Sequence, residues 1–335
     1  MASTRAAPGD TVVNLRGRTI CFVINHVAFF ASHRLPIALE VMKRGGRTLL
    51  ITGKSASVEM EASAVETVRA NGIRRKRLLF SSAGLNPFLE LAGLLQLVMV
   101  LRRERPDLVH AASPKALIYS GIACRLSGVP SFVGAVSGMG YAFTNDQKPS
   151  LRRRIARQAF LWLARYGLQH PNARVIVQNP SDRRELVCAG LVSDCNVRLI
   201  PGSGVDTRVF AADVCGEKEP LVLLPARLVL DKGIAEFAEA ARKVRSKCGS
   251  QWRFILAGAA DYASPNRVPD GMLKQRISDG IIEWVGYVKD MKDWYCRASI
   301  VCLPSYREGM PKALLEAAAA GCAVITTDVP GCRDA

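Results

Sequence analysis

Short apolar, β-branched runs alternate with amphipathic stretches along almost the whole chain, and no other feature restricts the fold as much. In the first part of the chain the expected strands are residues 19–24, 47–51, 107–110, 131–135, 173–177 and 197–200. The expected helices between them are residues 32–44, 87–104, 115–127, 151–170 and 181–189. Strands that alternate with helices in this way form βαβ units, which build a parallel sheet.

The same alternation starts again after a break at residues 206–219. The second set of expected strands is 221–225, 252–257, 281–284, 299–303 and 323–326, and the expected helices are 234–247, 271–278, 291–297 and 311–320. Two doubly wound α/β units that face each other across a cleft account for this pattern. We therefore expect an N-terminal Rossmann-like domain over residues 1–210 and a C-terminal one over residues 211–335.

The C-terminal unit is short for a doubly wound domain. The chain ends one loop after the expected strand 323–326, so no helix follows to cover that strand. We expect the C-terminal domain to be incomplete, and the chain to be less stable and less active than a longer one.

Positive charge is concentrated in the first two thirds of the sequence. The formal net charge is +17; residues 1–210 contain 29 Lys and Arg against 13 Asp and Glu, whereas residues 211–335 contain 17 against 16. Such an imbalance favours a polyanionic partner, which is a nucleic acid, a membrane surface or a phosphorylated ligand. A solvated basic surface without a partner explains it equally well.

Among these partners, the placement of the basic residues favours an anionic membrane surface. They form runs at residues 74–77 and 102–103, and five arginines lie in the expected helix 151–170. A core-packed helix with a solvated arginine face is the alternative. Aromatic residues make up only 7% of the chain, which weighs against stacking on nucleic acid bases. The sequence shows no signal peptide and no apolar run long enough to span a bilayer, so we expect a cytoplasmic protein.

Two groups of residues in the C-terminal half have the chemistry of an anion and sugar site. Arg227 and Lys232 lie in a loop between an expected strand and an expected helix, and two such cations can hold a diphosphate. Glu308 precedes the helix that begins near Pro311, and Glu316 lies within it. Carboxylates accept hydrogen bonds from vicinal hydroxyls, as in ribose recognition. A solvated loop and an exposed surface glutamate are the alternatives.

A third group lies in the N-terminal half. His26 and His110 fall at or just beyond the ends of expected strands, and ligands bind at that edge of an open α/β sheet. His33 and Arg34 fall at the start of an expected helix, which suits an anion. Structural histidines remain the alternative. The further members of this group are Asn25, Ser32 and residues 137–141.

Several common site motifs are absent from the sequence. It contains no Asp-x-Asp, no Walker A motif and no nucleophile elbow, and no G-x-G-x-x-G follows the first strand. Ten cysteines include no Cys-x-x-Cys pair, which favours a reducing compartment. We therefore expect no metal and no cofactor.

Taken in order, these motifs resemble a known family. The charged residues Arg227, Lys232, Glu308 and Glu316 follow a Gly-Ser-Gly-Val-Asp turn at residues 202–206. Further motifs are HAASPKA at 110–116, SGMGY at 137–141, VQNP at 177–180 and IPGSGVD at 200–206. From about residue 19 to 335 the chain resembles the retaining glycosyltransferases of family 4, which have the two-domain GT-B fold. Within them it resembles the capsule, O-antigen and N-glycan-pathway subgroup, which extends lipid-diphosphate-linked sugars.

The resemblance implies roles for the matching residues. Arg227 and Lys232 would neutralise the departing donor diphosphate, Glu308 would contact the donor sugar, and Glu316 would bind the ribose hydroxyls. The backbone would position the sugar at Gly309, Met310 and Pro311, and the nucleotide base would lie beside Gly286, Tyr287 and Val288. His110 would face the reacting side of the sugar. Fixed cations and a helix N-terminus aimed at a departing diphosphate stabilise the transition state electrostatically.

The resemblance predicts a retaining, metal-independent transferase at the inner face of the cytoplasmic membrane. It would move a hexose or N-acetylhexosamine from a nucleotide-diphosphate sugar, expected to be a UDP-sugar, to a polyprenyl-diphosphate-linked saccharide. Its partners would be this donor, this acceptor and the anionic membrane, with no nucleic acid. Two alternatives stay open: a GT-B-fold sugar-nucleotide epimerase, and an inactive truncated chain that still binds nucleotide or membrane.

Overall fold

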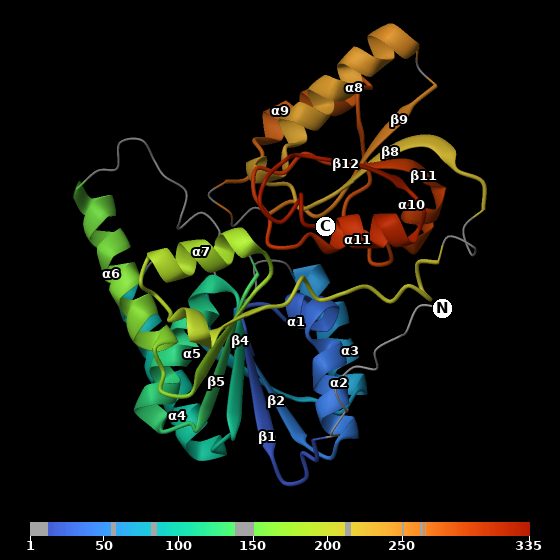
Figure 1. Cartoon of the computed structure of the whole chain (residues 1–335). Coiled ribbons are helices and arrows are strands. Elements are labelled where there is room, and N and C mark those ends of the chain that lie inside the picture. Colours follow the sequence, from blue (N-terminus) through green and yellow to red (C-terminus); the bar gives the residue numbers. More distant parts are fainter. Residues whose placement is uncertain are drawn as a thin grey trace, which may run out of the picture.

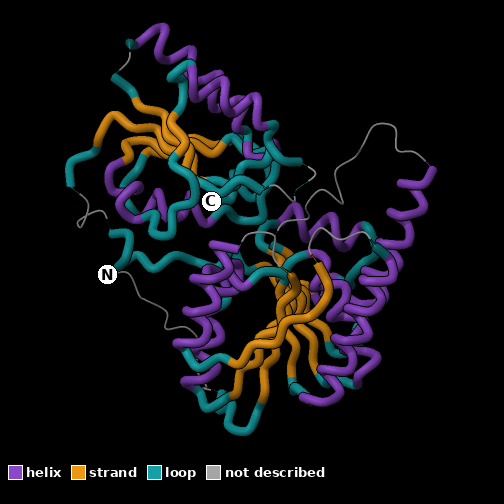
Figure 2. The backbone as a smooth tube through the Cα atoms, turned by 180° about the vertical axis from the view of Figure 1, so that it is seen from behind, coloured by secondary structure: helices purple, strands orange, loops and turns teal. Residues whose placement is uncertain are grey.

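A computed structural model describes residues 13–54, 58–81, 86–137, 151–211, 216–249, 251–261, 264 and 266–335. Two separate parallel sheets organise these residues, each with helices on both faces (Figure 1). Figure 2 shows the same two layers of strands from behind. The fold is thus a pair of Rossmann-like units, as the alternating sequence pattern predicts.

The first sheet has seven strands in the order β3-β2-β1-β4-β5-β6-β7, and every neighbouring pair is parallel. Its strands are β1 (Thr19–Ile24), β2 (Arg47–Lys54), β3 (Arg74–Ser81), β4 (Leu108–Ala112), β5 (Ser131–Val136), β6 (Ala173–Val177) and β7 (Val197–Leu199). Its helices are α1 (Val27–His33), α2 (Leu35–Lys43), α3 (Val58–Ala70), α4 (Pro87–Glu104), α5 (Pro114–Ser127), α6 (Leu151–Leu168) and α7 (Pro180–Cys188). A short 3-10 helix, η2 (Asp194–Asn196), precedes β7.

The two faces of this sheet hold separate hydrophobic cores. One core packs strand residues such as Val23 and Val109 against α4 to α7. The other packs Phe22, Ile24 and Leu50 against α1, α2 and α3. Successive side chains along a strand point to opposite faces of the sheet. His110, which pairs in register with Phe22, therefore lies on the α1 side.

The second sheet has five parallel strands in the order β10-β9-β8-β11-β12. Its strands are β8 (Glu219–Pro225), β9 (Arg253–Ala257), β10 (Glu283–Trp284), β11 (Ala298–Leu303) and β12 (Ala323–Thr326). Its helices are α8 (Ile234–Cys248), α9 (Asp270–Ser278), α10 (Lys292–Arg297) and α11 (Lys312–Ala319), with the 3-10 helix η4 (Leu230–Lys232) before α8. Helices α8 and α9 lie above this sheet in Figure 1, and α10 and α11 lie below it.

Local sequence signals explain where several helices begin. The Asn86 side chain accepts hydrogen bonds from the backbone amides of Phe88 and Leu89, and Pro87 occupies the first turn of α4. Asn179 caps α7 in the same way, with Pro180 next to it. An asparagine cap followed by proline is a strong helix start. The amides of the first turn have no acceptor within the helix, and proline has no N–H group that would be left unpaired there.

The structure corrects three sequence expectations. Residues 32–44 do not form one helix: α1 ends at His33, Arg34 leaves helical geometry, and α2 starts again with Pro36 in its first turn. Strand β3 and helix α3 were not expected, because the Arg and Lys residues of this edge strand hide its alternating pattern. The strand that was expected to end at His110 continues to Ala112, so His110 lies inside β4.

None of the helices formed by the described residues combines the length and the apolar character needed to cross a bilayer.

Candidate active site between the two sheet edges

Each sheet has one point where its strand order reverses. This point lies between β1 and β4 in the first sheet and between β8 and β11 in the second. Ligands of open α/β sheets bind beyond the carboxyl ends of the strands at such points. Most of the residues that the sequence singles out lie at these two edges: His26 and Arg34 near β1, and Arg227, Lys232 and Glu308 after β8 and β11.

The two edges face and contact each other. Asn179 Nδ2 at the start of α7 donates to the carbonyl oxygen of Gly309 at 2.9 Å, and the Lys312 ammonium lies 3.4 Å from the carbonyl oxygen of Ser32. Figure 1 shows α11 directly above α1, with α7 beneath the C-terminal unit. We refer to the two sides of this contact as the N-terminal wall and the C-terminal wall.

Lys232 and Glu308 form the centre of the C-terminal wall. Although 76 residues separate them, their side chains form an ion pair, and the Ser305 hydroxyl donates to the same Glu308 oxygen at 2.7 Å. The exposed fractions of the two charged side chains are 20% and 13%. A paired and half-buried carboxylate of this kind has a fixed position, as a group that contacts a substrate requires.

A close approach of two loops creates this pair. Gly233 has φ of 69°, and a Cβ atom placed there would lie 2.1 Å from the Pro304 carbonyl oxygen. The Tyr306 amide also donates to the Asp231 carbonyl oxygen at 2.9 Å. The loops after β8 and β11 therefore pack backbone to backbone, and only glycine at position 233 allows it.

Arg227 lies in the same loop as Lys232 but has a different partner. Its guanidinium pairs with Asp261, which follows β9, at 2.7 Å, and 61% of the Arg227 side chain is exposed. Asp261 was not among the predicted site residues, although it also follows the end of a strand and could have been found on that ground. In the structure, an acid partner therefore accompanies both predicted diphosphate-binding cations.

Glu316 lies in the second turn of α11, as the sequence predicts. Its carboxylate lies 3.1 Å from the Lys312 ammonium. It also contacts the buried Tyr295, whose pKa is raised well above its usual value by burial first and by Glu316 second. Glu316 thus lies on α11 and Glu308 on the loop before it. Each of the two carboxylates pairs with a different lysine.

The loop before α11 is anchored on both sides. Gly309 is buried, and Pro311 is the N-cap residue of α11 without a side-chain cap, so the first amides of this helix have no such partner. Met310 packs against Gly202, where a Cβ atom would lie 2.7 Å from Met310 Cγ. The Gly-Ser-Gly turn of the sequence therefore supports the loop that carries Glu308.

Gly286, Tyr287 and Val288 follow β10. The Gly258 amide, at the end of β9, donates to the Gly286 carbonyl oxygen at 2.8 Å, and Val288 packs on the core of the second sheet. Tyr287 is 43% exposed. Gly258 in turn contacts the backbone at Ala226, so this segment lies at the same sheet edge as Arg227 but two strands away from β8.

The N-terminal wall contains three neutral histidines, of which His110 is buried and His26 and His33 are partly buried. Burial first, and then the charge of Arg34, lower the pKa of His110 to about 3 and that of His33 to about 4. Lys312 of the opposite wall also contributes to the shift of His33. Burial lowers the pKa of His26 too, and Arg227 acts in the same direction. All three imidazoles are therefore uncharged at neutral pH.

The N-terminal wall also contains strain and unsatisfied polar atoms. Ser113, between β4 and α5, has φ of 80°, a conformation that a residue other than glycine adopts at a cost of about 1–3 kcal/mol. Asn25 Oδ1, His26 Nδ1 and His110 Nε2 are buried and have no hydrogen-bond partner among the described residues. Backbone strain and unpaired buried polar atoms both occur preferentially at functional sites, which makes this wall a candidate binding surface.

A further contact between the walls, made by Arg307, was not predicted. Arg307 Nη2 lies 2.7 Å from Asp182 Oδ1 and 2.8 Å from Glu185 Oε2, both on α7. The Asp182 side chain is fully buried, and it also accepts from Asn179 Nδ2 at 3.0 Å. Asn179 belongs to a motif that the sequence analysis quoted, but no local pattern links α7 to Arg307.

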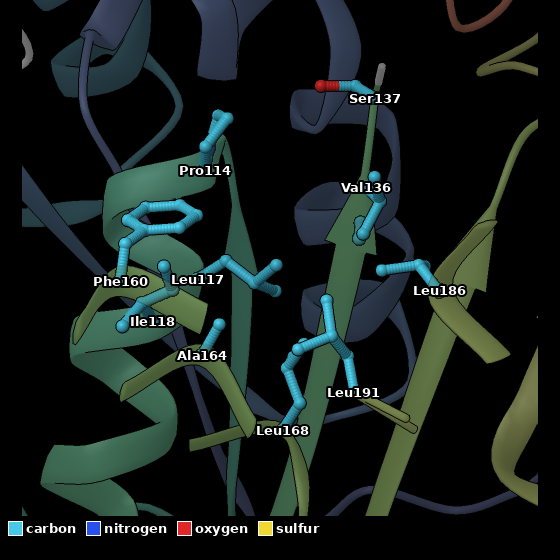
Figure 3. A pocket seen from close by; sticks show the side chains of 11 residues that line it. Pro114, Leu117, Ile118, Val136, Ser137, Phe160, Ala164, Leu168, Leu186 and Leu191 are labelled. Atoms are coloured by element: carbon cyan, nitrogen blue, oxygen red, sulfur yellow. The ribbon is translucent and has the colours of Figure 1, made fainter. Parts of the chain in front are cut away.

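An apolar pocket opens in the N-terminal unit between α5, α6, α7 and β5. Figure 3 shows Ser137, just after β5, at one end of the pocket and Leu168 and Leu191 at the other. None of the residues that line it is charged. It suits an apolar group and not a diphosphate, so it is distinct from the charged site between the walls.

Among the residues that the structure describes, no three His, Cys, Asp or Glu side chains are grouped closely enough to hold a metal ion.

Two protein-family models match the chain, one over each of the two sheets. Residues 36–209 match Glycosyltransferase Family 4, and residues 219–335 match Glycosyl transferases group 1. The first match covers more than half of the chain. The chain belongs to glycosyltransferase family 4.

Curated relatives act on lipid-linked sugars. The chain is 27% identical over 266 residues to N,N'-diacetylbacillosaminyl-diphospho-undecaprenol alpha-1,3-N-acetylgalactosaminyltransferase of Campylobacter jejuni, a match that covers 76% of this chain and 68% of the relative. It is 26% identical over 257 residues to UDP-Gal:alpha-D-GlcNAc-diphosphoundecaprenol alpha-1,3-galactosyltransferase of Escherichia coli, which covers 72% of this chain and 63% of the relative. The chain therefore spans about two thirds of the length of these relatives.

Solved structures establish the GT-B fold. HepE of Anabaena, solved with UDP and glucose, has a TM-score of 0.68 at 17% identity over 94% of this chain and 82% of its own. WaaG, a glycosyltransferase involved in lipopolysaccharide biosynthesis, has a TM-score of 0.66 at 14% identity over 93% and 82%. The fold that the sequence predicts is confirmed.

Proposed function

We propose that the chain transfers a hexose or N-acetylhexosamine from a nucleotide-diphosphate sugar, with UDP as the nucleotide, to a polyprenyl-diphosphate-linked saccharide. Family membership and the names of the two relatives support this choice of substrates. The observation that carries the proposal is the ion pair of Lys232 and Glu308, fixed where the strand order of the second sheet reverses.

The proposed donor site is the C-terminal wall. The donor diphosphate lies between Arg227, Lys232 and the uncapped N-terminus of α11, where cations and free amides attract an anion. Glu316 binds the ribose, and the base lies beside the segment at Tyr287. Glu308 and the backbone of the loop before α11 hold the donor sugar.

In the proposed reaction, an acceptor hydroxyl oxygen attacks the anomeric carbon as the bond to the β-phosphate oxygen breaks. The electron pair stays on the departing UDP, and the hydroxyl proton passes to that same phosphate oxygen. Attack from the face that the diphosphate leaves retains the configuration, and no carboxylate is needed as a nucleophile. Lys232 and Arg227 stabilise the charge that develops on the leaving group, so the proposed step uses no metal and no cofactor.

His110 completes the proposed sugar site from the N-terminal wall. Its pKa of about 3 keeps the imidazole neutral, and its Nε2 has no partner among the described residues. A neutral imidazole can exchange a hydrogen bond with a sugar hydroxyl without adding charge.

We also propose that the protein lies peripherally on the inner face of the cytoplasmic membrane. Helix α4 carries an exposed apolar stripe at helical spacing: Phe88 is 83% exposed, Leu91 55%, Leu95 52% and Met99 62%. A stripe of this size next to cations is typical of a helix that lies in a lipid interface. Arg102 and Arg103, both exposed, end the helix.

Helix α6 extends this surface, because α5 packs between α4 and α6. Trp162 is 67% exposed and stacks on Tyr166 with ring centroids 6.2 Å apart, and the Arg125 guanidinium lies 4.4 Å from the Tyr166 ring centre. Aromatic side chains beside arginine suit the headgroup region of a bilayer.

Transfer activity is the direct test of the proposed function. A panel of nucleotide sugars is offered with a polyprenyl-diphosphate-linked saccharide, and product is followed by mass. We expect transfer from a UDP-sugar, and Glu308→Gln to abolish most of it. Glu239→Gln, at a partly exposed glutamate of α8 that pairs with Arg242, leaves it unchanged. Turnover of the UDP-sugar without acceptor would instead identify an epimerase, and nucleotide binding without turnover a binding protein.

Sedimentation with vesicles tests the membrane surface. Met99→Glu with Leu95→Glu places charge in the stripe, and we expect it to release the protein from vesicles that contain anionic lipid. Ile37→Glu is the control, because Ile37 is 45% exposed on α2, outside this surface. Binding that ignores salt, anionic lipid and the double substitution would refute the proposed surface.

A further inference from the structure

Arg34 is a buried cation for which the described part of the chain supplies no acid partner. It stands between α1 and α2 and is 5% exposed. Its Nη1 donates to the neighbouring His33 carbonyl oxygen at 3.0 Å, and its guanidinium lies 5.8 Å from the Phe29 ring centre. Its Nε has no partner, and no carboxylate among the described residues pairs with it.

This arrangement is costly in the absence of a ligand. A buried charge that lacks a counter-charge loses its hydration and gains little in return. Burial lowers the pKa of Arg34, but an arginine stays charged at any physiological pH. Its nearest titratable neighbours, His33 and His110, are neutral at pH 7 and supply no negative charge.

Arg34 lies close to the site between the walls. Its charge contributes to the lowered pKa of His110, whose unpartnered Nε2 lies under α1 on the same face of the first sheet. Ser32, two residues before Arg34, contacts the opposite wall. Its carbonyl oxygen lies 3.4 Å from the Lys312 ammonium. An anion at Arg34 would therefore lie beside the proposed donor sugar and on the acceptor side of it.

We propose that Arg34 binds a phosphate of the acceptor's lipid diphosphate and so sets the position of the acceptor in the site. This inference rests on the proposed function. The alternative source of the same chemistry is the donor diphosphate, but Arg227 and Lys232 of the C-terminal wall already provide for that. Guanidinium groups form bidentate, charge-assisted hydrogen bonds with phosphate, each stronger than a bond between neutral groups.

An acceptor series tests the assignment. The same saccharide is offered as a lipid diphosphate, a lipid monophosphate and an uncharged alkyl glycoside to wild type, Arg34→Gln, Arg34→Lys and the control Arg44→Gln. Arg44 ends α2 and pairs with the exposed Glu40. We expect Arg34→Gln to raise KM for the diphosphate about 10- to 100-fold, in line with the loss of a charged hydrogen bond. KM for the uncharged glycoside and for the donor stays unchanged, and Arg34→Lys is intermediate.

Three outcomes of this series would overturn the assignment. Equal losses on all three acceptors would make Arg34 structural, and a rise confined to the donor KM would place the anion on the donor. If KM for all three acceptors is the same in wild type and in Arg34→Gln, Arg34 does not bind the acceptor phosphate. If wild type transfers to none of the acceptors, the proposed function fails, and Arg34 is then judged by stability alone.

Thermal unfolding provides that second, independent measurement. Because Arg34 is a buried charge without a counter-charge, we expect Arg34→Gln to unfold at the same or a higher temperature than wild type without ligand. Inorganic pyrophosphate should stabilise wild type and Lys232→Met, and stabilise Arg34→Gln less than either. A lower unfolding temperature for ligand-free Arg34→Gln, together with an undiminished pyrophosphate effect, would overturn the inference.

Discussion

The two walls of the site differ in how their charges are balanced. On the C-terminal wall every cation discussed has an acid partner: Lys232 with Glu308, Arg227 with Asp261 and Lys312 with Glu316. On the N-terminal wall Arg34 has no such partner within the described chain, and the histidines near it are neutral. The charges of the C-terminal wall are thus paired within the described chain, whereas the charge of Arg34 on the N-terminal wall is not.

The difference also separates two ways of binding phosphate. A donor diphosphate bound as we propose would have to compete with the acids that already pair with Arg227 and Lys232, which limits its affinity but keeps these cations in position. Arg34 has no acid partner among the described residues, so an anion that binds it as we propose displaces no carboxylate and interacts with a charge that is already largely dehydrated. Four predictions test this contrast, in order of expected effect.

Lys232→Met removes the central cation of the C-terminal wall. We expect kcat/KM for transfer to fall about 100- to 1,000-fold, the usual effect of removing one group that stabilises a developing oxyanion. Steady-state transfer kinetics measure it, with Lys243→Met as the control because Lys243 is exposed on α8. A loss smaller than about threefold would mean that Lys232 serves only to pair with Glu308.

Arg307→Ala breaks the contact between the walls and leaves Asp182 buried without its cation. We expect the free energy of unfolding to fall by about 2–3 kcal/mol, below the full effect of a buried pair because 22% of the Arg307 side chain is exposed. Urea denaturation measures the change. Arg333→Ala, whose partner Asp328 is 87% exposed, should change it by less than about 1 kcal/mol. Equal losses for both variants would contradict the prediction.

Low pH should destabilise the N-terminal wall. The folded pKa of His110, about 3, is below the unfolded value of 6.5, so the unfolded chain binds more protons between these values. Stability is therefore fully present above pH 6.5 and lost as the pH falls, by about 2 kcal/mol from His110 alone at pH 5. The difference between unfolding free energies at pH 7 and pH 5 measures it.

The control for the pH effect is His110→Gln, in which that difference should shrink by the same amount. His33 titrates over a similar range with a folded pKa of about 4, so part of the pH dependence should remain in the variant. An identical pH dependence in both proteins would show that His110 is not held neutral in the fold.

Arg227→Ala should have the smallest effect. Because 61% of the Arg227 side chain is exposed, water screens its charge, and we expect about a tenfold loss in kcat/KM for transfer. The matched control is Arg242→Ala, an equally exposed arginine paired with Glu239 on α8. A loss as large as that of Lys232→Met would remove the distinction between a central and a peripheral cation on this wall.

The sequence predicts much of the fold because buried parallel strands are encoded locally. Apolar runs such as β1 and β9 are found within a residue of their observed bounds. The failures have specific causes. The cations of β3 obscure an edge strand, and the break at Arg34 depends on how α1 and α2 pack, although Pro36 marks the second start.

The site is only partly predictable for a related reason. Lys232 and Glu308 could be selected because each lies at a strand end, but their contact depends on the approach of Gly233 to Pro304. The contact of Arg307 with Asp182 spans 125 positions along the chain, and no local spacing encodes it. The missing acid at Arg34 is also invisible in the sequence, since a buried charge is recognised only once its surroundings are known.

The connection of α7 to the loop before α11 has a mechanical consequence. Asn179 holds the Gly309 carbonyl oxygen, and Arg307 holds Asp182, so the residues on either side of Glu308 are tied to the opposite unit. Under the proposed function, a hinge rotation that widens the entrance for a bulky lipid-bound saccharide would also displace the loop that carries Glu308. In the proposed reaction, acceptor loading and donor release would thereby be mechanically coupled through these two hydrogen-bonded contacts.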